Sequence, residues 1–150
     1  MKRKFYCASG SDRGSGFSAK PMDEQKSKTI RGIVIDDELG IVNAFSRTMM
    51  RIDRFVVPQT KIIKSLKEAK QMIEEIRPDI VISDKEFDFN NRQAHAELLQ
   101  FIREKFPQTK VILCSSAVQN EDMAMGYDAI LAKPPDQAEL KRTLQKLAVD

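Results

Sequence analysis

The sequence predicts an α/β domain built on one five-stranded parallel sheet, and three features indicate it. Short apolar runs rich in β-branched residues recur along the chain from Ile30 onward. Segments with apolar residues at helical spacing separate these runs. Four of the runs end in polar residues that suit a ligand site at one edge of the sheet. Such alternation of strands and helices is typical of a doubly wound sheet.

Five runs are predicted as strands. Most are apolar at consecutive positions, which is typical of strands buried on both faces of a parallel sheet. The second run is the weakest, because it is short and stops before Pro58. In chain order the predicted strands are Ile30–Ile35, Phe55–Val57, Ile80–Ser83, Val111–Cys114 and Ala129–Ala132.

The intervening segments are predicted as helices. Pro78 and Pro107 end the second and the third, because the residue before a proline disfavours helical backbone. The fourth should be short, since only a few residues around Glu121–Met125 are available before Gly126. The other helices are predicted over about 39–52, 66–77, 94–106 and 136–148.

Right-handed crossovers leave few ways to order five such strands. The common arrangement at this size is the flavodoxin-like order 2-1-3-4-5, which places the first and third strands side by side. Asp36 and Asp37 follow the first strand, and Asp84 follows the third. We therefore expect the three carboxyl groups to meet where the strand order reverses.

The polar residues at the strand ends suit phosphoryl chemistry with a divalent cation. Adjacent carboxylates with a third nearby are hard oxygen ligands of the kind that Mg²⁺ takes. Ser115 and Ser116 follow the fourth strand and Lys133 follows the fifth, and a hydroxyl and an ammonium stabilise phosphoryl oxygens. Each residue taken singly is also explained as an ordinary turn, helix-start or solvated side chain. Their coincidence at one edge of the sheet favours a site.

Composition separates a tail from the folded part. Residues 1–28 contain a Ser/Gly-rich stretch and are predicted as a disordered basic tail, and residues 29–150 as one domain. Residues 1–31 hold eight basic and three acidic residues, so the rest of this +3 chain is mildly acidic and nucleic acid is an unfavoured partner. No apolar stretch is long enough for a membrane span, and Cys7 and Cys114 fit a reduced, cytoplasmic protein.

Four motifs together resemble the receiver domains of bacterial response regulators, over about residues 30–148. They are V-I-D-D-E at 34–38, P-D-I-V-I-S-D at 78–84, V-I-L-C-S-S at 111–116 and K-P at 133–134. Each motif is weak alone, but all four occur in the family's order on the matching elements. The resemblance implies a protein that is phosphorylated on an aspartate in two-component signalling and is not otherwise an enzyme.

The resemblance also implies a role for each residue of the site. Asp84 would accept the phosphoryl group in line, and Lys133 would pair first with its carboxylate and then with a phosphoryl oxygen. Ser115 would donate its hydroxyl to the phosphoryl group, with Ser116 as the second choice. The family also has a cis bond at Lys133–Pro134. The groups that would hold Mg²⁺ are Asp36, Asp37, Asp84 and the backbone carbonyl of Glu86.

The partners implied are a histidine kinase or histidine phosphotransfer protein as donor and a downstream protein as target, without membrane attachment. A homodimer is also compatible with the family. The rival interpretation is a pseudo-receiver, an interaction module that keeps the fold without phosphorylation. A third interpretation is a phosphatase-like hydrolase with Asp84 as nucleophile and Glu86 as general acid, which the absence of a cap domain disfavours.

The chain departs from the family in three places. The loop after Asp84 lacks the usual Met-Pro and Gly and reads K-E-F-D-F-N-N, which predicts exposed aromatic residues at Phe87 and Phe89. Only 17 residues separate Ser115 from Lys133, so the fourth helix should be short. Ile130 occupies the position of the usual switching aromatic residue. These departures predict intact phosphorylation chemistry with an altered output face.

Four side chains outside the site are assigned ordinary roles. His95 is expected on the exposed surface of the third helix, and Cys114 inside its strand. Met123 and Met125 are expected in the core rather than at an interface.

Overall fold

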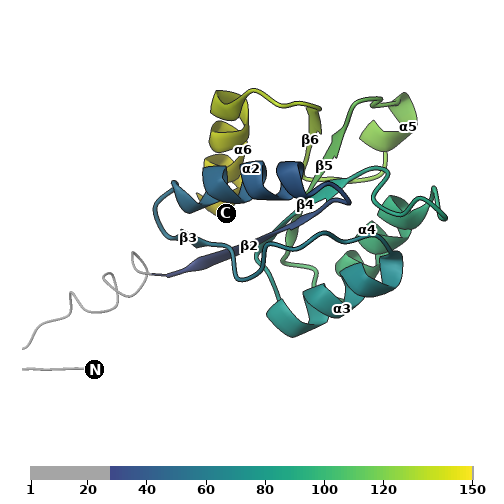
Figure 1. Cartoon of the computed structure of the whole chain (residues 1–150), viewed down its shortest axis with the longest axis horizontal. Helices are drawn as coiled ribbons and strands as arrows, with labels where there is room; N and C mark the ends of the chain where they lie inside the picture. Colours follow the sequence, from purple (N-terminus) through teal and green to yellow (C-terminus); the bar gives the residue numbers. More distant parts are fainter. Residues whose placement is uncertain (1–27, 150) are drawn as a thin grey trace, which may run out of the picture.

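The computed structural model describes residues 28–149. The predicted tail, residues 1–28, falls outside that part except for Lys28, so its disorder stays a prediction. The described chain forms three layers, with a central sheet and helices on both of its faces (Figure 1). None of the helices between residues 28 and 149 is long and apolar enough to cross a bilayer.

In the described part of the chain, five parallel strands form the sheet: β2 (Ile30–Ile35), β3 (Phe55–Val56), β4 (Ile80–Asp84), β5 (Lys110–Ser115) and β6 (Ala129–Ala132). Their order is β3-β2-β4-β5-β6, which confirms the predicted flavodoxin-like order 2-1-3-4-5. β2 and β4 are hydrogen-bonded neighbours, with Ile35 opposite Ser83. On the other side of β4, Asp84 lies opposite Cys114 of β5.

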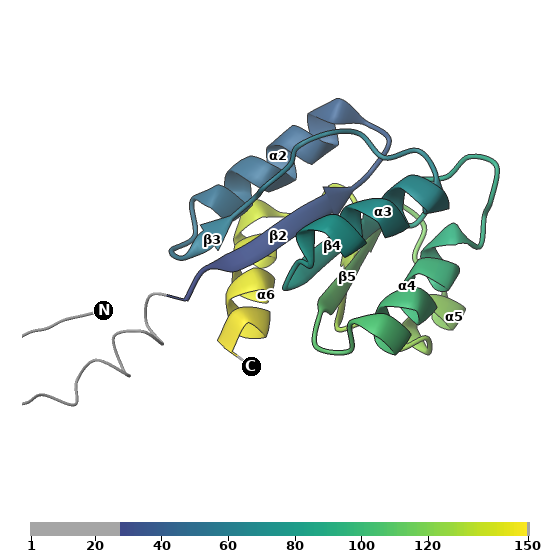
Figure 2. The same ribbon diagram turned by 90° about the horizontal axis from the view of Figure 1, so that it is seen from below.

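Between residues 28 and 149, five helices connect and follow the strands: α2 (Leu39–Met50), α3 (Leu66–Ile76), α4 (Ala94–Lys105), α5 (Asn120–Met123) and α6 (Gln137–Val149). The predicted helices are confirmed in number and order, with ends that differ by one or two residues. α5 is a single turn, as the short interval before β6 predicted. α2 and α6 lie on one side of the sheet and α3 and α4 on the other (Figure 2).

The sheet separates two hydrophobic cores, because neighbouring side chains of a strand point to opposite faces. Val34 and Ile82 pack into the core formed with α2 and α6. Ile33 and Val81 pack into the core formed with α3 and α4. Both faces of the inner strands are therefore buried, which explains why their sequences are continuously apolar.

Local signals end the helices and allow α2 to lie close to the sheet. Ser65 caps α3 by accepting the Glu68 backbone N–H at 3.2 Å, and Arg77 ends that helix in a left-handed conformation with φ of 52°. Gly32 of β2 lies beneath α2, where a Cβ would come within 2.5 Å of Met49 Sδ. A larger residue at Gly32 would force the Met49 side chain to repack.

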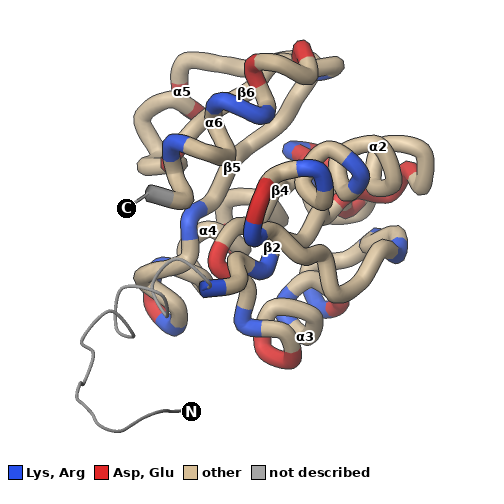
Figure 3. The backbone as a smooth tube through the Cα atoms, turned by 90° about the vertical axis from the view of Figure 1, so that its left-hand side faces the viewer, with Lys and Arg blue, Asp and Glu red and all other residues tan. Residues whose placement is uncertain are grey.

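Charged positions are mixed over the surface that Figure 3 presents. Lysines and acidic residues alternate along α3 and occur on the neighbouring elements in the same view.

Three expectations for side-chain burial are wrong. His95 is 5% exposed, and its Nδ1 lies 2.6 Å from the hydroxyl of Tyr127 in the segment before β6. The interior position of this face of α4 and the hydroxyl partner account for a buried histidine. Phe87 is fully buried in the core with α3 and α4, whereas Phe89 is 92% exposed as predicted. Met123, the last residue of α5, and Met125, just after the helix, are exposed, because a single helical turn does not cover them.

The burial of His95 predicts a pH-dependent contribution to stability. Burial lowers the pKa of His95 below its usual 6.5, although the nearby Asp122 carboxylate opposes this and Lys85 reinforces it. The unfolded chain therefore binds a proton more readily, so this contribution is fully present above pH 6.5 and is lost as the pH falls below it. We expect His95→Phe to lower the free energy of unfolding by about 1 kcal/mol at pH 7, through loss of the bond to Tyr127.

The difference in the free energy of unfolding between the parent and His95→Phe should become smaller as the pH is lowered from 7 to 5, because only the parent has to keep a neutral imidazole in the core. Urea denaturation at several pH values measures this difference, in which the other titrating groups cancel. A difference in the free energy of unfolding that stays constant or increases towards pH 5 would contradict the lowered pKa of His95.

Candidate functional site

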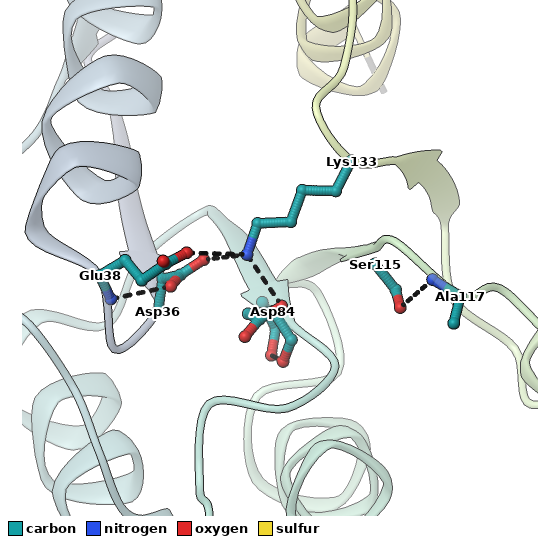
Figure 4. A network of polar contacts seen from close by, with 7 residues as sticks. Asp36, Glu38, Asp84, Ser115, Ala117 and Lys133 are labelled. Atoms are coloured by element: carbon teal, nitrogen blue, oxygen red, sulfur yellow. Dashed lines mark hydrogen bonds and ion pairs between the residues drawn. The ribbon is translucent and has the colours of Figure 1, made fainter.

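Four strands deliver polar side chains to one edge of the sheet, because parallel strands all end on the same side. Asp36 and Asp37 follow β2, and Asp84 is the last residue of β4. Ser115 is the last residue of β5, and Lys133 follows β6 directly. Figure 4 shows Lys133 reaching from the end of β6 towards Asp36 and Asp84, with Ser115 to one side.

The three predicted carboxyl groups are close together. Asp36, Asp37 and Asp84 each offer a carboxylate oxygen, and these oxygens lie within 4.8 Å of one another. Asp36 is 1% exposed and Asp84 is 9% exposed, whereas Asp37 faces the solvent. The cluster thus has a buried side and an open side from which an ion can enter.

Lys133 links the two buried carboxylates. Its Nζ lies 2.8 Å from Asp36 Oδ2 and 3.1 Å from Asp84 Oδ1. Glu38 is a more distant partner at 3.9 Å, and its backbone N–H donates to Asp36 Oδ1 at 2.9 Å. The peptide bond between Lys133 and Pro134 is cis, as the resemblance implied.

The protonation behaviour of the cluster reflects two buried acids with one cation between them. Burial raises the pKa of Asp84 to about 6, and the Asp36 carboxylate adds to this effect. Burial also raises the pKa of Asp36, although the hydrogen bond from Lys133 opposes it. Burial disfavours the charged form of Lys133, but hydrogen bonds and attraction from the two carboxylates outweigh it and raise the pKa of this lysine. Negative charge is therefore in excess, which favours a further cation.

The two serines differ in their surroundings. Ser115 is 4% exposed, and its Oγ accepts the backbone N–H of Ala117 at 3.0 Å. Ser116 is exposed. Both line the open hollow next to Asp84, so the choice between them as hydroxyl donor stays a prediction.

The cluster opens into a hollow of about 670 Å³. Glu86 lines it, and the role of its backbone carbonyl as a metal ligand remains a prediction. Phe89 stands exposed at its border. The remaining lining residues are mostly charged or small, namely Asp37, Glu38, Ile41, Asp84, Asp88, Arg92, Ser115, Ser116, Lys133 and Pro134.

Contacts of Phe87 and Asp88 hold the loop after Asp84 in place, which its sequence does not indicate. Asp88 accepts the backbone N–H of Leu66 at 3.0 Å and that of Asn90 at 3.0 Å, so it holds the loop against the start of α3. Phe87 anchors the loop in the core below. Asp88 precedes Phe89 in a run of polar and aromatic residues, and its partner lies 22 positions away, so the sequence carries no signal for this contact.

Cys114 lies opposite Asp84 inside the sheet, which agrees with the predicted buried position. Burial raises the pKa of its thiol to about 11, so the group is protonated at neutral pH. Such a thiol is a poor nucleophile and metal ligand. Cys114 therefore acts as a packing residue next to the site.

Comparison with known proteins supports the fold. No protein-family model and no curated protein matches the sequence. Among solved structures, a response regulator from Thermotoga maritima is 24% identical, with a TM-score of 0.67 over 81% of this chain and 99% of that one. The chemotaxis response regulator CheY4 of Vibrio cholerae is 21% identical, with a TM-score of 0.65 over 80% of this chain and 99% of that one.

The chain has the fold of a response-regulator receiver domain. A LuxR-family DNA-binding response regulator from Staphylococcus aureus has the same fold at 23% identity, with a TM-score of 0.66 over 79% of this chain and 98% of that one. At these identities the likeness establishes the receiver fold, and the chemistry has to be argued from the site itself.

The charge excess of the site predicts that removing one carboxylate stabilises the metal-free protein. We expect Asp84→Asn to raise the free energy of unfolding by about 1–2 kcal/mol at pH 7 in EDTA, less than the full pKa shift implies because Lys133 loses part of its pairing. Addition of millimolar Mg²⁺ should stabilise the parent more than the variant, since binding to the folded state adds stability by mass action. Urea denaturation with EDTA or Mg²⁺ measures both effects. A variant that is less stable than the parent in EDTA would contradict this account of the cluster.

Proposed function

We propose that this protein is a receiver of two-component signalling that is phosphorylated on Asp84 in a Mg²⁺-dependent reaction. The observation that carries the proposal is the sharing of the Lys133 ammonium by two buried carboxylates, next to an exposed third. A structural ion pair needs one carboxylate for each ammonium. The surplus carboxylates, open to solvent on the Asp37 side, suit a site that takes up a divalent cation and a phosphoryl group.

The residues present fit Mg²⁺. The donor set is made of carboxylate oxygens, which are the hard ligands this ion prefers, and it leaves positions for water and phosphoryl oxygens. Asp37 would hold the ion from the open side and Asp84 and Asp36 from the buried side, and the backbone carbonyl of Glu86 would complete the protein ligands. When bound, Mg²⁺ supplies positive charge that offsets the charge of the transferring phosphoryl oxygens.

Asp84 acts as the nucleophile in this proposal. One carboxylate oxygen forms the bond to phosphorus while the bond from phosphorus to the donor's leaving group breaks, and that bond's electron pair departs with the leaving group. The product is an acyl phosphate on Asp84. Lys133 then pairs with a phosphoryl oxygen, and Ser115, or Ser116 in its place, donates a hydroxyl hydrogen to another.

The donor we propose is a phosphohistidine of a kinase or phosphotransfer protein, and the output is a change in binding to a downstream protein. The protein would work in the cytoplasm, where such donors act, and would be no enzyme beyond its own phosphorylation and dephosphorylation. Self-association into a homodimer is a further form that the output could take.

The second candidate function is a pseudo-receiver that binds partners without phosphorylation. Ile130, in place of an aromatic residue in β6, and the remodelled loop from Lys85 to Asn91 favour it. The two functions make opposite predictions for the reaction of Asp84 with a small phosphodonor.

Incubation of the full chain with acetyl phosphate and Mg²⁺ should add one phosphoryl group, measured by intact-mass spectrometry. We expect the adduct to be lost in EDTA, because the phosphoryl charge is then not offset, and to be absent from Asp84→Asn. Lys133→Met should slow adduct formation by about 100-fold, as expected for removal of one charged transition-state partner. An unmodified parent protein that also fails to bind Mg²⁺ would favour the pseudo-receiver.

A further inference from the structure

Lys85 connects the phosphorylation site to the segment before α5, and the proposed chemistry does not use its side chain. Its Nζ lies 2.8 Å from Asp122 Oδ2 and 3.4 Å from the backbone oxygen of Ala117. Its backbone N–H donates to the carbonyl of Cys114 at 3.1 Å. The residue directly after Asp84 therefore contacts the chain both before and after Ser115.

The ion pair of Lys85 with Asp122 joins a half-buried lysine to a buried carboxylate. The side chains are 16% and 4% exposed, whereas the surface pair of Lys105 with Glu74 is 59% and 49% exposed. Burial alone would raise the pKa of Asp122, but the hydrogen bonds from Lys85 and from the Gln119 backbone outweigh it and lower that pKa, so the carboxylate stays charged and paired. The pair therefore holds Asp122 in a fixed position relative to Lys85, the residue directly after Asp84.

Asp122 and Ala117 are the two points at which Lys85 holds the segment. Asp122 Oδ2 also accepts the backbone N–H of Gln119 at 2.8 Å, so the same carboxylate starts α5. The backbone N–H of Ala117 donates to Ser115 Oγ at 3.0 Å, a contact drawn in Figure 4. Ala117 is thus bound to the candidate hydroxyl through its N–H and to Lys85 through its carbonyl.

Through these contacts, a movement of the Ser115 hydroxyl can change the position of helix α5. When the Ser115 hydroxyl turns to a phosphoryl oxygen on Asp84, the N–H of Ala117 loses its acceptor or has to follow. The carbonyl of the same residue and the carboxylate that starts α5 share one ammonium, so a shift of Ala117 changes the geometry at Asp122 as well. The ring of Tyr127, the aromatic residue nearest to β6 in the sequence, instead faces His95 of α4.

We propose that Lys85 is a positioning residue that makes the segment from Ser116 to Gln119 and helix α5 respond together to phosphorylation of Asp84. It does so through the shared contacts with Ala117 and Asp122. This inference rests on the proposed function, because it needs a phosphoryl group or its mimic on Asp84.

Hydrogen exchange measured by mass spectrometry tests this coupling, with Mg²⁺ and beryllofluoride as the phosphoryl mimic. Fluorine NMR of the bound beryllofluoride, with Asp84→Asn as negative control, shows that the site is occupied. In the parent, occupancy should change exchange in peptides that cover residues 116–126. In the double variant Lys85→Met and Asp122→Asn, which removes both charges of this pair, beryllofluoride should still bind and that change should be at least twofold smaller.

The matched control is the double variant Lys105→Met and Glu74→Gln, which removes an ion pair of the same type from the surface. It should keep the parental response. If the Lys85 double variant does not fold, Lys85→Met alone serves, because it removes the contacts with both Ala117 and Asp122 while Asp122 can still accept the Gln119 N–H.

The outcomes separate the two proposals. A parent that binds no beryllofluoride overturns the proposed function and the inference with it. An occupied parent and an occupied Lys85 double variant with equal changes at residues 116–126 overturn the inference alone. The same applies if the surface-pair control loses the response as strongly as the Lys85 double variant does.

Discussion

The organisation of the carboxyl edge depends on the Lys133 ammonium, which lies between the carboxylates of Asp36 and Asp84 at 2.8 and 3.1 Å. Lys133 follows β6, and its partners follow β2 or end β4, so this contact joins residues from three strands of the sheet. The contact is costly for folding, because buried charges lose hydration and two anions share one cation. Its geometry is therefore better explained by chemistry than by stability, and the excess negative charge is what an incoming cation would relieve.

The sequence was sufficient to predict those features that depend on local pattern and on topology. Continuous apolar runs identify strands buried on both faces, and the reversal of strand order then brings Asp36, Asp37 and Asp84 together. The position of Lys133 follows in the same way, since every parallel strand ends at this edge. For these residues, assigning the strands correctly is almost enough to predict their place at the sheet edge.

Features that depend on contacts between distant residues could not be predicted in this way. His95 is buried because a hydroxyl 32 positions away, on Tyr127, meets its ring. Phe87 is buried because the loop after β4 folds back over the core, while Phe89, two residues later, stays exposed. The ion pair between Lys85 and Asp122 joins residues 37 positions apart. No periodicity or motif in the sequence predicts these contacts. They lie on the side of the site where the chain departs most from the family pattern.

The central claim is that the carboxylate of Asp84 becomes an acyl phosphate. Borohydride reduction after treatment with acetyl phosphate and Mg²⁺ tests it most directly, because the reagent converts an aspartyl phosphate to homoserine at the modified position. Peptide sequencing by mass spectrometry should then find homoserine at position 84, and only in samples that contained Mg²⁺. Homoserine at another aspartate, or at none while the protein is folded and binds Mg²⁺, would contradict the account.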